Sequence, residues 1–310
     1  MKKMLLVIAM MFVSLQAREV IEAQGTCKIN WTGGFITCEG ESAEGQSSYA
    51  AKLSAKVIAQ RNLLEVIRGV QIDSAMTIKD GMFSSDVIHS RVSGVVKGAQ
   101  LISNKYDKKE KYAVATLKLQ MGKDLLSALL SDPKLLSWNE KIEKAWNSFS
   151  IVANANAATY SPSEKATIQK VLEDLRKRND EKGTEYLTSV LNEMEDSVYS
   201  GVLIDVSEID NFKKAMIVKL VDESGKEVYP AKIVSKKTLL KRNTSVGYIY
   251  GLKDARESKR VKSKPIEIKA KAVYKKRYSN IVLTKEQLAV IESLAPAILQ
   301  KAKVILVMGE

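Results

Sequence analysis

Histidine is almost absent from this 310-residue chain, which contains only His89. A Ser-His-Asp triad, a Cys-His pair and a histidine metal site all need histidine, and the residues around His89 supply no matching spacing. The sequence also lacks a lysine-containing phosphate loop and a dinucleotide-binding glycine fingerprint. We therefore expect His89 to be a surface or half-buried structural residue, and we expect no enzymatic activity, no cofactor and no metal site.

Long apolar runs are also scarce. One run, residues 4–13, follows Lys2 and Lys3 and is too short to cross a bilayer. A positive start followed by a short apolar run is typical of a secretory signal, and we expect cleavage after Ala17. Later apolar runs are too short to predict a transmembrane helix. The sequence therefore predicts a periplasmic protein that is soluble or peripheral to the outer membrane.

Only two cysteines are present, Cys27 and Cys38. They flank a tight-turn sequence, Trp-Thr-Gly-Gly-Phe at residues 31–35, between two short alternating segments. A hairpin folded about this turn brings the cysteines nearly opposite each other, and an oxidising compartment favours a disulfide between them. Two buried free thiols are the alternative. Neither cysteine has the surroundings of a lipid-attachment site.

Residues 46–121 begin with the pattern of an amphipathic helix. Its apolar residues recur three or four positions apart, or twice that, which predicts one buried face made of Ala50, Leu53, Val57, Leu64 and Ile67. Arg68 provides a basic last turn and Gly69 a left-handed C′ residue, so the helix should end there. The even spacing of apolar residues over 70–78 then predicts a strand.

Two further strands are expected at residues 94–106 and 111–121, joined as a hairpin by the charged turn at 107–110. Between the strand groups, Ser84 to Asp86 should cap a short helix that reaches about Arg91, and a short apolar helix should follow at 123–130. Gly94 and Gly98 would mark a bend or bulge in a strand. The N-terminal domain, residues 26–131, is thus expected to be a helix packed on a small antiparallel sheet.

The next segment, residues 132–198, has the pattern of a charged helical connector. A capping box with a proline at the first helical position, Ser-Pro-Ser-Glu at 161–164, predicts a helix start there, and Lys182 with Gly183 predicts a break. The apolar stripe is narrow. The connector is therefore either a bundle packed against its own domains or a coiled coil that binds a partner.

Residues 199–310 return to strand patterns, with a hairpin turn at 222–225 and a helix that begins with the capping box of Thr284 and Gln287. The apolar terminal strand, 304–307, should be central in a sheet. The predicted fold class is α+β. It consists of two small domains, each a mainly antiparallel sheet with packed helices, joined by a charged helical arm.

Charge is the strongest signal unrelated to packing. Sixteen lysines and arginines but only three acids fall between Lys232 and Tyr278, so this stretch alone carries an excess equal to the net charge of +13 of the whole chain. Four tyrosines are interleaved with it. We expect an anionic partner to bind its basic side chains, namely Arg260, Lys262, Lys269, Lys271, Lys275, Lys276 and Arg277.

Three interpretations of this basic stretch compete. A nucleic-acid surface would combine charge and aromatics in this way, but export argues against it, and we expect no nucleic-acid partner. An anionic envelope partner, such as lipopolysaccharide, acidic groups of peptidoglycan or an acidic protein, suits the compartment. A solvated face, whose lysines keep sheet edges from pairing, is the third interpretation.

Several segments together resemble a family of small outer-membrane lipoproteins that includes flagellar basal-disk and motility lipoproteins. The resemblance rests on residues 59–64, 67–70 and 92–99 of the first domain, on 29–33 before its helix, and on 200–205 and 222–229 of the second. It implies an envelope protein of a Gram-negative bacterium, associated with flagellar structure and without enzymatic activity. The lipidated cysteine by which many members are anchored is missing, so a periplasmic location is expected.

Two functional hypotheses follow. The first is a non-catalytic exported envelope protein that scaffolds or assembles a larger structure, with a flagellar or motility role, and whose partners are envelope or flagellar proteins or further copies of itself. The second is a periplasmic binding module for an anionic envelope ligand, which the basic C-terminal domain would hold.

Overall fold

The computed structural model describes residues 18–130, 162–178, 180–181, 183–187, 199–230, 233–262, 264–294 and 296–309. The predicted signal segment and the greater part of the predicted connector lie outside these residues. Within the connector, helix α6 (Pro162–Lys177) begins where the proline at the first helical position predicts it. None of the helices in the described ranges has the length and apolarity needed to cross a membrane.

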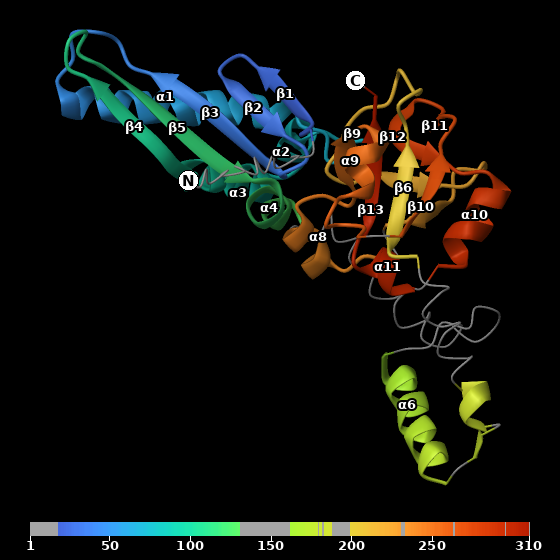
Figure 1. Cartoon of the computed structure of the whole chain (residues 1–310). Helices are drawn as coiled ribbons and strands as arrows, with labels where there is room; N and C mark the ends of the chain where they lie inside the picture. The colour runs from blue at the N-terminus through green and yellow to red at the C-terminus, as the bar shows by residue number, and fades with distance from the viewer. Residues whose placement is uncertain are drawn as a thin grey trace, which may run out of the picture.

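The first domain is an antiparallel five-stranded sheet covered on one face by a long helix (Figure 1). The strand order is β1-β2-β3-β5-β4, with bounds Ile21–Gln24, Cys27–Asn30, Phe35–Glu41, Tyr112–Gln120 and Gln100–Asp107. Helix α1 (Ser48–Gly69) is capped by the Ser47 side chain, which accepts a hydrogen bond from the Ala50 N–H. The predicted hairpin between β4 and β5 is confirmed.

The buried face of α1 differs from the predicted one. Ile67 is buried as expected, but Leu53 and Val57 are 53% and 55% exposed, and the rest of the buried face is Ala51, Ala55, Ala59 and Leu63. The cause is the close approach of β3: a Cβ atom on Gly40 would lie 2.1 Å from the Ala59 backbone nitrogen. Only small side chains fit between a helix and a sheet at this distance, so alanines displace the larger apolar residues outward.

The segment after α1 is irregular where a strand was predicted, and a helix begins at its end. Gly69 ends α1 without a left-handed residue, and only an isolated bridge, Gln71 to Thr77, remains of the expected strand. Thr77 and Asp80 form a capping box that begins α2 (Ile78–Ser84). This local cap outweighs the weak alternating pattern.

The Ser85 cap is confirmed, but the helix that it begins, α3 (Asp86–Lys97), extends beyond Arg91. Gly94 is therefore helical and Gly98 is the C-cap of α3, so neither marks a bulge in a strand. The end of the first domain is a π-helical turn, η1 (Met121–Leu126), followed by α4 (Ser127–Leu129).

The second domain contains two four-stranded sheets with helices around them. One sheet has the order β10-β6-β13-β9, with bounds Pro265–Lys269, Gly201–Asp205, Val304–Met308 and Gly247–Tyr250. The other has the order β11-β12-β7-β8, with bounds Val273–Tyr274, Arg277–Val282, Lys219–Val221 and Glu227–Tyr229. The short helices are α8 (Lys236–Arg242), α9 (Leu252–Arg256), α10 (Lys285–Glu292) and α11 (Pro296–Gln300).

These elements confirm the α+β class, the hairpin turn at 222–225, the Thr284 capping box and the inner position of the last strand, β13. The pairing in the first of these sheets differs from the antiparallel one expected, because β10, β6, β13 and β9 all run parallel. Nearly continuous burial along β6 and β13 fits this arrangement, since parallel strands are covered on both faces.

The two domains contact each other directly, and one hydrophobic cluster continues from the first into the second. Backbone groups of residues 71 and 72 accept hydrogen bonds from Met216 and Ile217 at 3.0 and 2.8 Å. Thr32 Oγ1 donates to the Tyr248 carbonyl oxygen at 2.6 Å. The Trp31 ring lies edge-on to the Tyr248 ring, with centroids 5.5 Å apart.

Asn243 makes two further hydrogen bonds across this contact. Its side-chain oxygen accepts from the Gly122 N–H at 3.1 Å, and its side-chain nitrogen donates to the Gly33 carbonyl oxygen at 3.4 Å. A Cβ atom on Gly122 would lie 2.2 Å from the Leu240 carbonyl oxygen, so this position requires glycine. We conclude that the first domain is docked on the turn after α8.

Candidate functional site

The disulfide predicted from the hairpin is confirmed. Cys27 and Cys38 are directly paired across β2 and β3, and their sulfurs are bonded. Both residues are buried, and the turn between the strands uses Gly34 in a left-handed conformation. This bond fixes the hairpin that carries Trp31 and Thr32 to the second domain.

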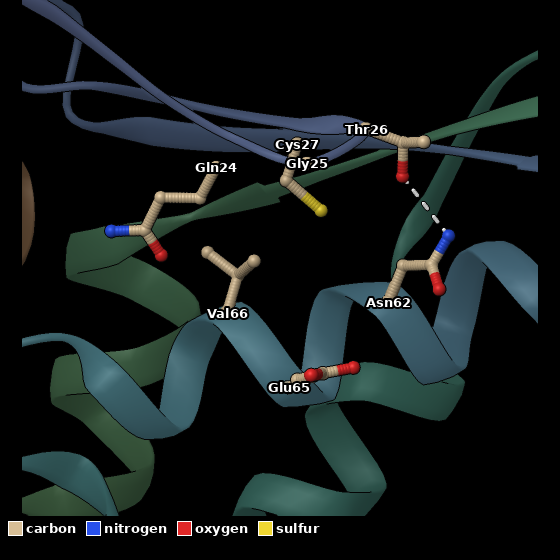
Figure 2. A pocket seen from close by; sticks show the side chains of 7 residues that line it. All are labelled: Gln24, Gly25, Thr26, Cys27, Asn62, Glu65 and Val66. Atoms are coloured by element: carbon tan, nitrogen blue, oxygen red, sulfur yellow. Dashed lines mark hydrogen bonds between the residues drawn. The ribbon is translucent and has the colours of Figure 1, made fainter.

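A pocket of about 440 Å³ lies between the β1–β2 turn and α1. Figure 2 shows Asn62 on α1 beneath Thr26 of the turn, and the Asn62 amide donates to Thr26 Oγ1 at 3.0 Å and to the Glu39 carbonyl oxygen at 2.8 Å. Cys27 and Val66 supply the apolar part of the lining. Glu65 is its one titratable side chain, because Cys27 is held in the disulfide, so the pocket has neither an acid–base pair nor a cation for an anionic ligand.

A second pocket, of about 450 Å³, contains one of the predicted anion-binding residues, Lys271. Acidic Glu208 and Asp210 line the same pocket. Lys269 is exposed beside it and forms an ion pair with Glu208 at 2.5 Å, which raises the pKa of Lys269. Because these acids already balance the lysines, this pocket is a poor site for an anion.

Lys275, Lys276 and Arg277 lie at the tip of the β11–β12 hairpin, and all three are exposed. The Lys275 ammonium lies 4.9 Å from the centroid of the Tyr274 ring, and the Tyr274 hydroxyl donates to the Ser224 carbonyl oxygen at 2.7 Å. The hairpin tip is thus a small basic projection, held by its own tyrosine.

Arg260 occupies a different environment from the exposed one expected. Its Nε donates to the Ala302 carbonyl oxygen at 2.7 Å, and its Nη2 donates to the carbonyl oxygens of Thr244 and Ser245, both at 3.1 Å. Burial lowers the pKa of Arg260 to about 10. This guanidinium therefore joins backbone segments inside the domain, and we correct its assignment as a direct ligand contact.

Tyr248, one of the four tyrosines interleaved with the basic stretch, is not available to a partner either. Its side chain is fully buried, and its hydroxyl donates to the Ala215 carbonyl oxygen at 2.6 Å and accepts from the Ala215 N–H at 3.0 Å. Burial raises the pKa of Tyr248 well above its usual range. Tyr229, also fully buried, donates to the Ser245 carbonyl oxygen.

Lys262 is exposed, and it belongs to a basic group centred on the half-buried Lys303, whose pKa is lowered by burial and then by the charges of Lys262, Lys301 and Arg242. The sequence did not single out Lys303, Lys301 or Arg242. Lys301 and Lys303 lie outside the basic stretch, directly before the terminal strand. In the sequence, nothing marks Lys301 and Lys303 as part of a basic group except that both lie next to the apolar run at 304–307. The parallel pairing of β13 with β6 and β9 brings them to this place, and that pairing is not local in sequence.

The first domain has a free sheet edge with exposed apolar side chains near it. Strand β4 is at the end of the sheet order, so its outer side has no strand partner in the described chain. Leu101 and Ile102 on this strand are 44% and 51% exposed. The Asn104 amide donates to the Lys52 carbonyl oxygen at 3.1 Å, which places β4 next to the part of α1 that exposes Leu53.

His89 is exposed on α3, away from both pockets. Within the described ranges, no group of three or more His, Cys, Asp or Glu side chains is arranged to hold a metal ion. The described geometry therefore offers surfaces and small pockets, and we find no nucleophile placed beside a base.

Comparison with known proteins relates the second domain to a described family. The family Treponema pallidum Tp0624, second domain, matches residues 201–310. The match begins with β6 and includes β13, so it covers both sheets of this domain. None of the curated proteins matches the chain.

Proposed function

We propose that this protein is a non-catalytic, exported envelope protein that assembles larger structures in the periplasm, in a flagellar or motility context. One observation supports the scaffolding role above others: the free edge of β4, flanked by exposed apolar side chains of α1 and β4. A strand at a sheet edge presents unpaired N–H and C=O groups that another strand can bind.

The partner that fits this edge best is a second copy of the same chain. Two identical antiparallel edges can pair about a two-fold axis, and each then satisfies the backbone groups of the other. Tyr49, Leu53 and Val57 are exposed one turn apart along α1, at 80%, 53% and 55%. These side chains would add an apolar contact beside the paired edges.

The disulfide supports the exported location. Disulfides persist in oxidising compartments such as the periplasm and are rare in the cytosol. The bond between Cys27 and Cys38 closes a hairpin that contacts the second domain, so oxidation stabilises the contact between the domains as well as the hairpin.

A cell-based experiment tests the scaffolding role. A strain that lacks the protein is complemented with the wild type, with Ile102→Lys, or with Ile21→Lys, which changes a similarly exposed isoleucine on β1, at the other edge of the sheet. We expect loss of motility or envelope integrity with Ile102→Lys, because a lysine on an edge opposes strand pairing. Full complementation by Ile102→Lys at normal protein level would contradict an assembly role for β4.

A second candidate function, binding of an anionic envelope ligand by the second domain, is favoured by one specific observation. Lys275, Lys276, Arg277, Lys262 and Lys301 are all exposed, and none of them is in an ion pair with an acid of the described residues. Unpaired surface cations attract anions, and the attraction weakens as salt is added. Lipopolysaccharide and acidic groups of peptidoglycan are the envelope ligands with this chemistry.

A further inference from the structure

A group of basic residues lies at one end of the parallel sheet. Strands β6, β9, β10 and β13 run parallel, so the amino-terminal ends of all four lie at the same end of the sheet. Figure 1 shows α8 and α11 at the end of the domain where β6 begins. We call the basic residues here the amino-end rim, which consists of Arg242, Lys262, Lys301 and Lys303.

Backbone hydrogen bonds hold the rim in place. The Arg242 Nε donates to the Lys301 carbonyl oxygen at 3.1 Å, which ties the end of α8 to the loop before β13. Arg260 donates to the carbonyl oxygen of the next residue, Ala302, and to two carbonyls before β9. The loop that carries Lys301 and Lys303 is therefore fixed by two guanidiniums from two other segments.

The rim lacks compensating acids. None of its four side chains forms an ion pair with Asp or Glu in the part of the chain that the structure describes. Lys303 is half-buried, and burial, followed by the charges of Lys262, Lys301 and Arg242, lowers its pKa. Like charges held together in this way gain most from a bound anion, because the anion relieves their repulsion.

Other basic residues of the domain are less suited to such a role. Lys269 is paired with Glu208, and Lys271 shares its pocket with Glu208 and Asp210. At the hairpin tip, Lys275 lies over the Tyr274 ring. Compared with these described lysines, the rim combines an anchored backbone, a half-buried lysine and uncompensated charge.

We infer that the amino-end rim binds a dianionic phosphate group, such as a phosphate monoester. An arginine fork and several lysine ammoniums are the side chains that proteins use to hold phosphate, and a dianion can neutralise two cations of the rim where a single carboxylate neutralises one. Arg260 is a positioning residue, because its hydrogen bonds fix the loop and not the ligand. This inference rests on the second candidate function and specifies its site and ligand class.

The test uses the full chain and two kinds of probe. Pyrophosphate is titrated by calorimetry, and flotation measures binding to phosphatidylcholine vesicles that contain either phosphatidic acid, a monoester, or phosphatidylglycerol, a diester. We expect binding of pyrophosphate and a preference for phosphatidic acid. The affinity should fall at least about tenfold between about 50 and about 200 mM salt. Tighter binding to vesicles than to pyrophosphate identifies a lipid headgroup as the source of the phosphate, and equal binding identifies a free phosphate ligand.

Matched double variants locate the site. Lys301→Gln with Lys303→Gln should weaken binding at least about tenfold, whereas Lys275→Gln with Lys276→Gln, which removes the same charge, should change it less than about twofold. The melting temperature of each variant shows that it is folded. Should the rim variant not fold, ¹³C-methylated wild type gives a second measurement, in which pyrophosphate should raise the pKa of the Lys303 amine.

Three outcomes would overturn the inference. The first is no binding of either probe, and the second is equal loss in both double variants. The third is binding of glutarate, a dicarboxylate, as tight as that of pyrophosphate. In the last two cases anion binding by the domain would stand without this site or ligand. The first would also remove the second candidate function, while the β4 scaffolding proposal is tested separately by motility and assembly.

Discussion

The two domains differ in how much of each sheet is covered by other elements. In the first, one helix covers one face, the other face and the β4 edge remain accessible, and a disulfide ties the hairpin. In the second, the inner strands of the parallel sheet are buried along nearly their whole length, and basic residues gather where the strands begin. The comparison indicates that the first domain offers backbone and apolar contacts, which are insensitive to salt, while the second offers charge, which salt screens.

The largest effect on stability is expected when the disulfide of the first domain is removed. Cys27→Ser with Cys38→Ser should lower the free energy of unfolding by about 3 kcal/mol, because an unlinked chain gains loop entropy. Urea denaturation followed by Trp fluorescence and circular dichroism would measure the change. Reduced wild type should match the double variant. A loss below about 1 kcal/mol would show that the hairpin is held by its packing alone.

The second largest effect is expected from a substitution that forces the two domains apart. In Gly122→Ala, the new methyl group would lie 2.2 Å from the Leu240 carbonyl oxygen and 2.7 Å from the Asn243 side-chain oxygen, so the contact has to open. We expect a cost of about 2 kcal/mol and a split of one unfolding transition into two. A single unchanged transition would show that the domains do not stabilise each other through Asn243.

A pH effect should be specific to the second domain. Burial raises the pKa of Tyr248 above its ordinary value of 10.0, so the folded state holds this proton more tightly than the unfolded state. The resulting stability is fully present below pH 10 and decreases as the pH rises above it. Tyr248→Phe should remove this contribution and reduce the loss by about 1.4 kcal/mol per pH unit. Urea denaturation between about pH 8 and about pH 11 measures both slopes, and parallel slopes would contradict the account.

The smallest expected effect has the opposite sign. Gly94 lies inside α3, and a Cβ atom there would meet no other atom within 4 Å. Gly94→Ala should therefore stabilise the first domain by about 0.5–1 kcal/mol through helix propensity. It also serves as the control for Gly122→Ala, because both replace a glycine of the same domain by alanine. Destabilisation would restore the sequence-based prediction of a strand at this position.

Local features of the fold could be predicted from the sequence. The hairpin about residues 31–34, the disulfide, the Ser85 cap and the Thr284 capping box all depend on residues close together in the chain. The buried face of α1 could not be predicted from the sequence, because it is set by the close approach of Gly40 to Ala59, which depends on tertiary packing. The parallel pairing in the second domain could not be predicted either, because it joins strands that lie far apart in the sequence.

In the candidate site, too, the features set by neighbouring residues were predictable, and those set by contacts between distant residues were not. Exposure of Lys275 and Lys276 was predictable, because a two-residue turn between strands leaves its side chains in solvent. The enclosure of Arg260 was not, since its three acceptors come from residues 244, 245 and 302. The grouping of Lys262 with Lys303 depends on the same distant pairing.

The most direct test of the central claim is the oligomeric state of the full chain by sedimentation velocity, at about 50 and about 500 mM salt. The account predicts a dimer or larger assembly of the wild type that persists at high salt. Ile102→Lys should dissociate it, and Ile21→Lys should leave it intact. A monomer under all conditions, or an assembly that Ile102→Lys does not change, would contradict the proposal that the first domain assembles through β4.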